Sequence, residues 1–487
     1  DRARVDITLQ PGAVSEVIEV TGAPPLLEAE NSSLSQVVEN TAIRSMPLNG
    51  RNYQQLAMLA PGVLPARVRN SVTDAFSVNG ANMFQNQFVM DGMDNNNYVT
   101  GVATASNQVM KPSVDAIQEF KMETHNLSAE FGRGGGGVMQ VTTRSGTNQL
   151  HGTMFEFLRN DKLDANDFFN SGRPKAPFRM NQFGGTLGGP VARDRTFFFG
   201  SYQGTRIREQ RTRLSAVPTR EMLAGDFGRT AVSDPSTQNT AGLRQPFPNN
   251  RIPKDRLDPV SSKMLDLYPA PNRDAVQNFL FNAPQTDDVE QVDTRFDHRF
   301  RDRDTIFLRY SFHDRAKLES GTLPLPASGS DTLLRDVRAH TAVLSETHIF
   351  PGANLVNEVR VAYSRNVALG DTPTKERLWQ QLGFKGLVDR EDINGLPLFT
   401  VSGFSALGDR ATTPDPKTAD VRQIVDNLSW TKGRHSVRFG GNIRSFVRYA
   451  GTADSARGRF TFNGQFTGAQ AGRGSGSSVA DALLGLT

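Results

Sequence analysis

The chain has 487 residues, no cysteine, and 55 basic against 51 acidic side chains, which gives a formal net charge of +4. A cysteine-free chain excludes disulfides and thiolate metal sites, and charges mixed this evenly do not predict a nucleic acid partner. No apolar window of about 18 residues occurs, so we expect no transmembrane helix. The 44 glycines and the recurrent turn residues suit an all-β chain.

Two segments precede the first predicted domain. Residues 1–10 alternate polar and apolar side chains and predict the last strand of an upstream β-domain. Residues 11–31 form a linker with three prolines and a short extended acidic and apolar segment, made of Glu16, Val17, Ile18, Glu19, Val20 and Thr21. Because the sequence starts inside a strand pattern and ends without a closing strand, we expect it to be a fragment of a longer precursor.

Residues 32–148 predict a small α+β domain. Asn52 is placed to cap a helix over residues 53–59, and Gln55 would complete the capping pair. A helical turn is expected at residues 113–117. Short strands are expected at residues 76–79, 87–90, 120–124 and 138–143.

A run of glycines at residues 134–137 follows Gly132 and formally matches the G-x-G-x-x-G pattern of a phosphate-binding loop. That interpretation requires a helix after the glycines. Residues 138–143 predict a strand instead, so we expect closely packed backbone rather than a phosphate site.

From residue 151 onward, pairs of predicted strands joined by tight turns alternate with long connections. The turns lie at residues 191–194, 301–304, 351–354 and 432–434, and the main long connections at 161–178, 209–290, 315–336 and 367–420. In the longest connection, Asp258 and Pro259 predict the start of a helix. About ten strands are expected, at residues 151–160, 179–190, 195–208, 291–300, 305–314, 337–350, 355–366, 421–431, 435–450 and 458–467.

The side chains of these strands alternate in character. Along residues 437–449 one face carries Val437, Phe439, Ile443, Val447 and Tyr449, which we expect to point outward, and the other carries Arg438, Arg444 and Arg448, which we expect to point inward. Soluble antiparallel sheets alternate in the same way. The rhythm of short turns and long loops favours an outer-membrane β-barrel, whose tilted strands need about 9–11 residues to cross the bilayer. We expect interfacial aromatic belts to include members of the set Tyr202, Tyr310, Tyr363, Trp430 and Tyr449.

No cluster of residues predicts an enzyme, a metal site or a cofactor. His340 and His348 share one face of a strand but lie about 27 Å apart at the rise of a strand. Residues 91–97 are rich in aspartate and asparagine and could suit calcium, but they lack the spacing of an EF-hand loop and also fit an ordinary turn. We favour the turn.

Four segments, at residues 46–53, 89–94, 128–136 and 145–148, share one resemblance. They resemble the plug of Oar-like TonB-dependent transporters, which are large outer-membrane proteins with an N-terminal carboxypeptidase-regulatory-like domain. Residues 151–161, 181–190 and 196–200 resemble the first barrel strands of that family, and residues 253–272 resemble its first large loop. The plug-like segments are residues 46–53, with Asn49, Gly50 and Arg51; residues 89–94, with Asp91, Gly92 and Asp94; residues 128–136, with Glu130, Phe131, Gly132 and Arg133; and residues 145–148.

The resemblance implies a mainly β fold in which residues 32–148 are a plug and residues 149–487 are the N-terminal part of a barrel. Such barrels have about 22 strands, so about ten strands make at most half of one. It also implies a place in the outer membrane of a Gram-negative bacterium, contact with its lipid, and uptake of an unidentified external ligand. A periplasmic TonB protein would pull on residues 16–21 as a TonB box and use proton-motive force to displace the plug. The alternative is a non-transporting adhesin or polymer-binding scaffold on the same barrel.

Overall fold

The computed structural model describes residues 33–66, 75–99, 107–132, 134–166, 175–387, 389–390, 392–471 and 475–487. The expected strand at residues 1–10 and the segment at residues 16–21 lie outside the described residues. Among the helices that are described, none combines the length and the apolar character needed to cross a membrane.

Residues 33–148, here called the inner domain, are built around a five-stranded sheet in the order β1-β6-β7-β4-β5. β4 and β7 run parallel, and the other neighbouring strands run antiparallel. The sheet consists of β1 (Leu34–Glu39), β4 (Gln87–Met90), β5 (Met93–Asp94), β6 (Ile117–His125) and β7 (Val138–Thr143). The remaining elements are β2 (Val63–Pro65), β3 (Phe76–Val78), α1 (Asn40–Ser45) and the 3₁₀ helices η1 (Asn49–Arg51), η2 (Tyr53–Leu59), η3 (Met83–Gln85) and η5 (Val114–Ala116).

Helical segments pack against this sheet to form the core of the inner domain. Tyr53 of η2 is fully buried, and its ring centroid lies 6.1 Å from that of Phe120 in β6. The side chain of Asn52 caps η2 by accepting a hydrogen bond from the amide of Gln54. The prediction that Gln55 completes a capping pair with Asn52 is wrong. The side-chain amide of Gln55 instead forms hydrogen bonds with the backbone amide and the carbonyl of Asn49, both of which the 3₁₀ turn leaves within reach.

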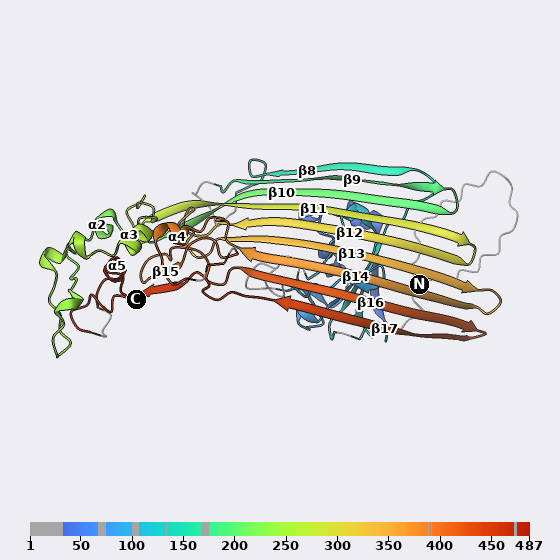
Figure 1. Ribbon diagram of the computed structural model, residues 1–487. Helices are drawn as coiled ribbons and strands as arrows, with labels where there is room; N and C mark the ends of the chain where they lie inside the picture. Colours follow the sequence, from blue (N-terminus) through green and yellow to red (C-terminus); the bar gives the residue numbers. More distant parts are fainter. Residues whose placement is uncertain are drawn as a thin grey trace.

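Nine strands form one antiparallel sheet, here called the wall, whose order follows the sequence from β8 to β17 (Figure 1). Tight turns join its hairpins at one end, and the long connections lead from the other. Its strands are β8 (His151–Asn160), β9 (Phe178–Ala192), β10 (Thr196–Ser215), β11 (Phe279–Arg301), β12 (Asp304–Glu319), β13 (Leu333–Phe350), β14 (Leu355–Asp371), β16 (Asp415–Lys432) and β17 (His435–Ala450). The sheet is open, with β8 and β17 at its edges.

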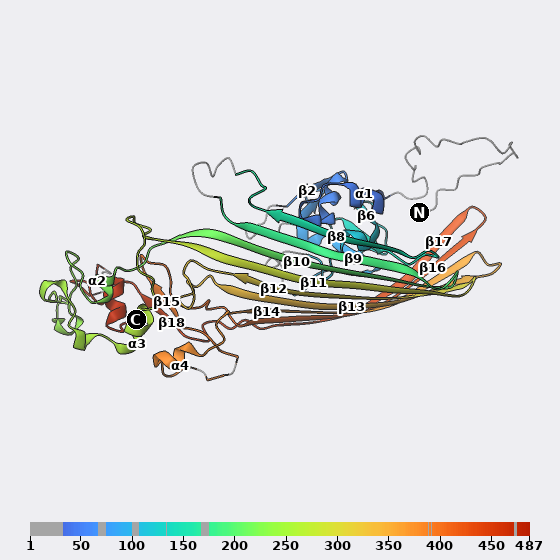
Figure 2. The ribbon, with the colours of Figure 1, turned by 90° about the horizontal axis from the view of Figure 1, so that it is seen from above.

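The inner domain lies on one side of the curved wall (Figure 2). Strand alternation therefore divides the side chains of the wall between a face toward the inner domain and an outer face. Ile443 of β17 is 74% exposed on the outer face, whereas the adjacent Arg444 reaches Asp94 of the inner domain. The expected direction of the apolar and cationic faces of β17 is thus confirmed.

The outer face carries an apolar band. On β12, the outward-facing Ile306, Leu308, Tyr310 and Phe312 lie between Asp304 and Asp314. The step from Asp304 to Asp314 spans about 34 Å of strand at about 3.4 Å per residue. At a tilt of about 40° that length corresponds to roughly 25 Å along the membrane normal, which is the height of the lipid-facing band in outer-membrane barrels.

The five aromatic residues expected at the membrane interfaces all lie on the outer face, with 36–62% of their surface exposed. Three tyrosine hydroxyls make hydrogen bonds with polar side chains of a neighbouring strand: Tyr202 with Glu290, Tyr310 with His340, and Tyr363 with Asp420. An apolar ring beside a polar partner suits the boundary between lipid and water. The place of these rings in interfacial belts stays a prediction, and Tyr310 lies among the apolar residues of the band.

The long connections pack together beyond one end of the wall into a single body, here called the cap (residues 216–278, 320–332, 372–414 and 451–487; Figure 1). Met264, Phe399 and Phe462 come from different connections and share its buried core. Its elements are α2 (Arg220–Leu223), η7 (Pro235–Thr237), η8 (Pro248–Asn250), η9 (Lys254–Arg256), α3 (Pro259–Leu265), α4 (Leu378–Leu382), β15 (Leu398–Val401), β18 (Arg459–Phe462) and α5 (Ser478–Leu483). As predicted, Asp258 caps α3, since its carboxylate accepts bonds from two backbone amides of the first turn.

The expected tenth wall strand at residues 458–467 is wrong. β18 covers only Arg459–Phe462 and pairs in parallel with β15 inside the cap. Phe462 is 1% exposed, and its ring centroid lies 5.0 Å from that of Phe399. A strand this short cannot cross a bilayer. The apolar alternation of this segment instead fills the core of the cap.

Candidate functional site

Asp91 stands at the centre of the contact between the inner domain and the wall. Its carboxylate accepts hydrogen bonds from the amide and the hydroxyl of Thr143, both at 2.9 Å, which fixes it beside the end of β7. From the wall, Arg309 Nε lies 2.7 Å from Asp91 Oδ2, and Arg295 Nη1 lies 3.4 Å from Oδ1. The side chains of Asp91 and Arg309 are 2% and 1% exposed, so the ion pair is shielded from water.

The wall holds Arg309 in place independently of the inner domain. Arg309 Nη1 donates to the hydroxyl of Ser311 at 2.8 Å, and that hydroxyl donates to Asp293 Oδ1 at 2.6 Å. Asp293 is itself buried, at 3% exposure. A buried guanidinium needs both a counter-ion and hydrogen-bond partners to offset its desolvation. The wall therefore presents a positioned cation to Asp91.

Asp94 makes a second ionic contact with the wall, near the edge formed by β16 and β17. Its carboxylate pairs with Arg444 of β17 and accepts a hydrogen bond of 2.7 Å from the hydroxyl of Tyr98. The amide of Asp94 donates to Gln423 Oε1 of β16 at 2.9 Å. The Asp94 side chain is 1% exposed. Because Asp91 contacts β11 and β12, the two aspartates, through their carboxylates and the amide of Asp94, connect the inner domain to four wall strands.

Gly92 lies between these two aspartates at the closest approach to β14. Its φ of +78° falls in the left-handed region that glycine adopts without strain. A Cβ atom at this position would lie 2.5 Å from Arg360 Nη1 of the wall. The backbone conformation therefore favours glycine here, and a side chain at this position would also have to displace the guanidinium end of Arg360.

The segment containing Asn49, Gly50 and Arg51 contacts the opposite edge of the wall. The guanidinium carbon of Arg51 lies 4.7 Å and 4.2 Å from the ring centroids of Phe155 and Phe157 in β8. Gln182 of β9 donates to the carbonyl of Gly50 at 3.2 Å. Asn49 bonds Gln55 within the inner domain. Two members of the segment thus contact the wall, and Arg51 also forms an ion pair with Asp115 of η5.

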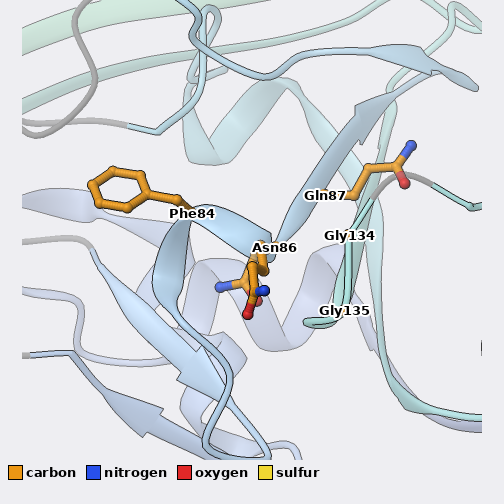
Figure 3. A pocket seen from close by; sticks show the side chains of 6 residues that line it. Phe84, Asn86, Gln87, Gly134 and Gly135 are labelled. Atoms are coloured by element: carbon orange, nitrogen blue, oxygen red, sulfur yellow. The ribbon is translucent and has the colours of Figure 1, made fainter.

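The third motif does not join these contacts. Glu130 and Gly132 are exposed, Phe131 is half-buried in a turn, and Arg133 lies outside the described residues. The following glycines border a small open cavity of about 140 Å³ beside Phe84, Asn86 and Gln87 (Figure 3).

Close packing explains the glycine run. A Cβ at Gly134 would lie 1.9 Å from the carbonyl oxygen of Gln85, and one at Gly137 would lie 2.5 Å from Met122 Cε. β7 begins directly afterwards, at Val138. The expectation of closely packed backbone followed by a strand is confirmed, and the glycines do not begin a helix.

The chain passes from the inner domain into the wall between Thr143 and His151, where β7 ends and β8 begins. Ser145 donates to Asp297 of β11 at 2.7 Å. The side-chain amide of Asn148 donates to the Asp194 carboxylate, in the turn between β9 and β10, at 2.6 Å. These bonds fix the connection at the end of the wall that carries the tight turns.

The arrangement can hold one body against another through buried ion pairs and hydrogen bonds. The aspartates that could have suited calcium have arginine partners, so the turn interpretation of residues 91–97 agrees with the geometry. The alternation along residues 437–449 predicts Arg444 on the inner face, and the structure places Arg295 of β11 on that face as well. Their pairing with Asp91 and Asp94 carried no sequence signal, because partners on different domains lie more than two hundred residues apart.

Comparison with known proteins agrees with this architecture. The family model described as an outer membrane beta barrel domain matches residues 142–487. The TonB-dependent transporter Oar of Myxococcus xanthus is 30% identical over 224 residues, which cover 43% of this chain and 20% of that protein. Neither description is that of an enzyme.

Among solved structures, the outer membrane transporter YddB from Escherichia coli is similar in fold, with a TM-score of 0.54 at 12% identity. The likeness covers 86% of this chain and 48% of YddB. The chain therefore spans about a fifth of the length of Oar and about half that of YddB. The family match shows that the chain belongs to the outer membrane beta barrel domain family of the Gram-negative outer membrane, and part of the chain is homologous to the TonB-dependent transporter Oar.

Proposed function

We propose that the chain is part of an energy-coupled transporter, in which the inner domain is a plug that blocks the lumen until a periplasmic partner releases it. The observation that carries the proposal is the buried pairing of Asp91 with Arg309 across the boundary between two separately folded bodies. The inner domain has its own sheet and its own core, so it can leave the wall without unfolding the strands.

The character of the interface supports release. Much of the contact around Asp91 and Asp94 consists of ion pairs and hydrogen bonds, and the apolar contacts are small clusters such as Met93 with Val343 and Val425. Charged groups that leave such an interface regain hydration, which offsets part of the lost attraction. A polar interface of this kind suits reversible association better than a continuous hydrophobic core does.

The proposed partner is a TonB protein that binds residues 16–21. An extended segment with unpaired backbone groups can be captured by addition to the edge of a sheet in another protein. Glu16–Thr21 lies between prolines at positions 11, 24 and 25, which disfavour its incorporation into a helix. Force applied there would reach the inner domain through residues 22–32 and act first on β1.

The test uses the full-length protein in its outer membrane. Deleting residues 16–21 should abolish retention of the periplasmic domain of TonB, because the captured strand is lost. Deleting residues 26–31, a segment of equal length in the same linker, should leave TonB retention intact. Equal retention by both variants would contradict the assignment of the box. A protein that binds surface polymer equally well with and without an energised membrane, and never retains TonB, would be an adhesin.

A further inference from the structure

Three side chains that bind metals in many proteins meet on the outer face of the wall, away from the inner domain. Asp304 lies at the start of β12, and Glu346 and His348 lie near the end of β13. One donor atom from each residue lies within 4.8 Å of the others. All three side chains are half-buried.

The register of the two strands fixes this grouping. Asp304 pairs directly with His348 across the sheet, and Glu346 pairs with Ile306, two residues further along β12. Residues two apart on one strand, together with the residue directly opposite, point to the same face and approach within contact distance. Glu346 and His348 can therefore keep their positions on β13 while their donor atoms and that of Asp304 surround one point.

The charges of these three side chains favour the binding of a cation. His348 Nδ1 lies 2.5 Å from Asp304 Oδ1, while the Glu346 carboxylate has no hydrogen bond or ion pair within the described part of the chain. The Glu346 carboxylate therefore carries a negative charge that pairs with no side chain in the described part of the chain. The ring of Phe350 packs against that of His348 with centroids 4.3 Å apart, which restrains the imidazole in its present orientation.

We propose that Asp304, Glu346 and His348 form a binding site for a divalent transition metal ion of the Zn²⁺ type. One imidazole nitrogen and two carboxylate oxygens are a donor set that zinc accepts, with the fourth position open to water. The nitrogen donor disfavours Mg²⁺ and Ca²⁺, which prefer oxygen ligands alone. Binding of the ion would replace the contact between His348 and Asp304 with a metal bond to each.

The site lies at the end of the apolar band nearest the tight turns, which is the periplasmic side of an outer-membrane barrel. It joins the hairpin of β11 and β12 to the hairpin of β13 and β14. A bound ion would neutralise carboxylates beside the lipid headgroups and hold the two hairpins together at the turn end. It has no residue in common with the contacts of the inner domain.

The experiment uses the full-length protein purified in detergent without a polyhistidine tag, with Zn²⁺ measured by calorimetry and Co²⁺ by its visible absorption. Glu346→Gln, Asp304→Asn and His348→Ala should each weaken Zn²⁺ binding by at least about tenfold, since even outer partners of a metal site contribute about 10–100-fold. His340→Ala is the matched control, because His340 lies on the same face of β13 and contacts Tyr310 rather than a carboxylate.

Binding should also weaken toward acidic pH, because protons compete with the metal for the imidazole. Chelation should lower the thermal stability of the parent protein and leave that of the Glu346→Gln variant unchanged. Retention of the parent affinity and stoichiometry by all three site variants would overturn the proposal. So would a parent protein that binds neither Zn²⁺ nor Co²⁺, whatever the outcome of the TonB experiment.

Discussion

Asp91 of the inner domain and Arg309 of β12 form an ion pair in which Nε and Oδ2 are 2.7 Å apart and both side chains are almost fully buried. The pair joins residues from two bodies with separate sheets. Each partner has further bonds within its own body, Asp91 to Thr143 and Arg309 to Ser311. Each charge is therefore positioned before the two bodies meet.

Asp91→Ala should destabilise the docked state by about 3–5 kcal/mol, because it leaves the guanidinium of Arg309 buried without its counter-ion. Thermal unfolding of the full-length protein measures the change. Adding Arg309→Met to this variant should recover part of the loss. Asp288→Ala is the control, since it removes a half-exposed pair with Arg208 that is worth less than about 1 kcal/mol. A loss no larger than that of the control would contradict the role of the pair.

Gly92→Ala should loosen the inner domain, whereas Gly80→Ala should have a much smaller effect. The φ angles of Gly92 and Gly80 are +78° and +77°, so an alanine would meet the same backbone strain at either position. Only Gly92 has a neighbour there, since a Cβ would lie 2.5 Å from Arg360 while Gly80 has open space. Limited proteolysis of the inner domain reports the difference. Equal protease sensitivity of the two variants would show that contact with Arg360 is unimportant.

Ile443→Arg should reduce the amount of folded protein in the outer membrane far more than Arg448→Ile. Ile443 pairs with Ile424 in the middle of the apolar band, where an added arginine costs about 2–4 kcal/mol. Arg448 occupies the opposite face of the same strand. Arg444→Ile is a poorer comparison, because Arg444 neutralises the buried Asp94. Heat-modifiable mobility of membrane extracts provides the measurement, and equal yields would refute the assignment of faces.

The cap should become less stable as pH rises from acidic values. Burial raises the pKa of Asp409, although Ser328 and the amide of Leu396 donate to its carboxylate. A raised pKa in the folded state means that the stabilisation is complete below the ordinary value of about 3.9 and is lost as pH rises through the raised value. Asp409→Asn should flatten this dependence. Hydrogen exchange of cap peptides, corrected for intrinsic exchange rates, measures how the stability of the cap depends on pH. The same pH dependence in the variant and in the parent protein would show that Asp409 is not its source.

Much of the wall could be predicted because alternation and tight turns are local signals. β8 and β17 were expected at residues 151–160 and 435–450, and both bounds hold. β10 and β11 run further than expected, to Ser215 and from Phe279. Beyond the lipid their outer residues are charged, so the apolar alternation stops. Cross-strand pairs such as Arg208 with Asp288 continue the sheet there.

The cap and the interface of the inner domain could not be predicted in the same way. Phe399 and Phe462 pack together although they are 63 residues apart in the sequence. The local pattern of neither segment indicates which other segment it contacts. Short apolar runs in loops resemble strands, which is why residues 458–467 were assigned to the wall. The ionic contacts depend likewise on tertiary placement, as the 204 residues between Asp91 and Arg295 show.

The central claim is that the inner domain leaves the wall when the membrane is energised, and thiol labelling tests it most directly because residues 1–487 contain no cysteine. Ser113 of the inner domain is 3% exposed and its hydroxyl lies 3.0 Å from that of Ser201 on β10, so a cysteine at position 113 reports on separation of the two bodies. Ser236, exposed in the cap, provides the position for a labelling control.

In cells that express the full-length protein, Ser236→Cys should react with a membrane-impermeant maleimide under all conditions. Ser113→Cys should react only when the proton-motive force and residues 16–21 are both present, because only then is the ion pair between Asp91 and Arg309 pulled apart. Labelling of Ser113→Cys that stays the same after the proton-motive force is collapsed, or after residues 16–21 are deleted, would contradict the account.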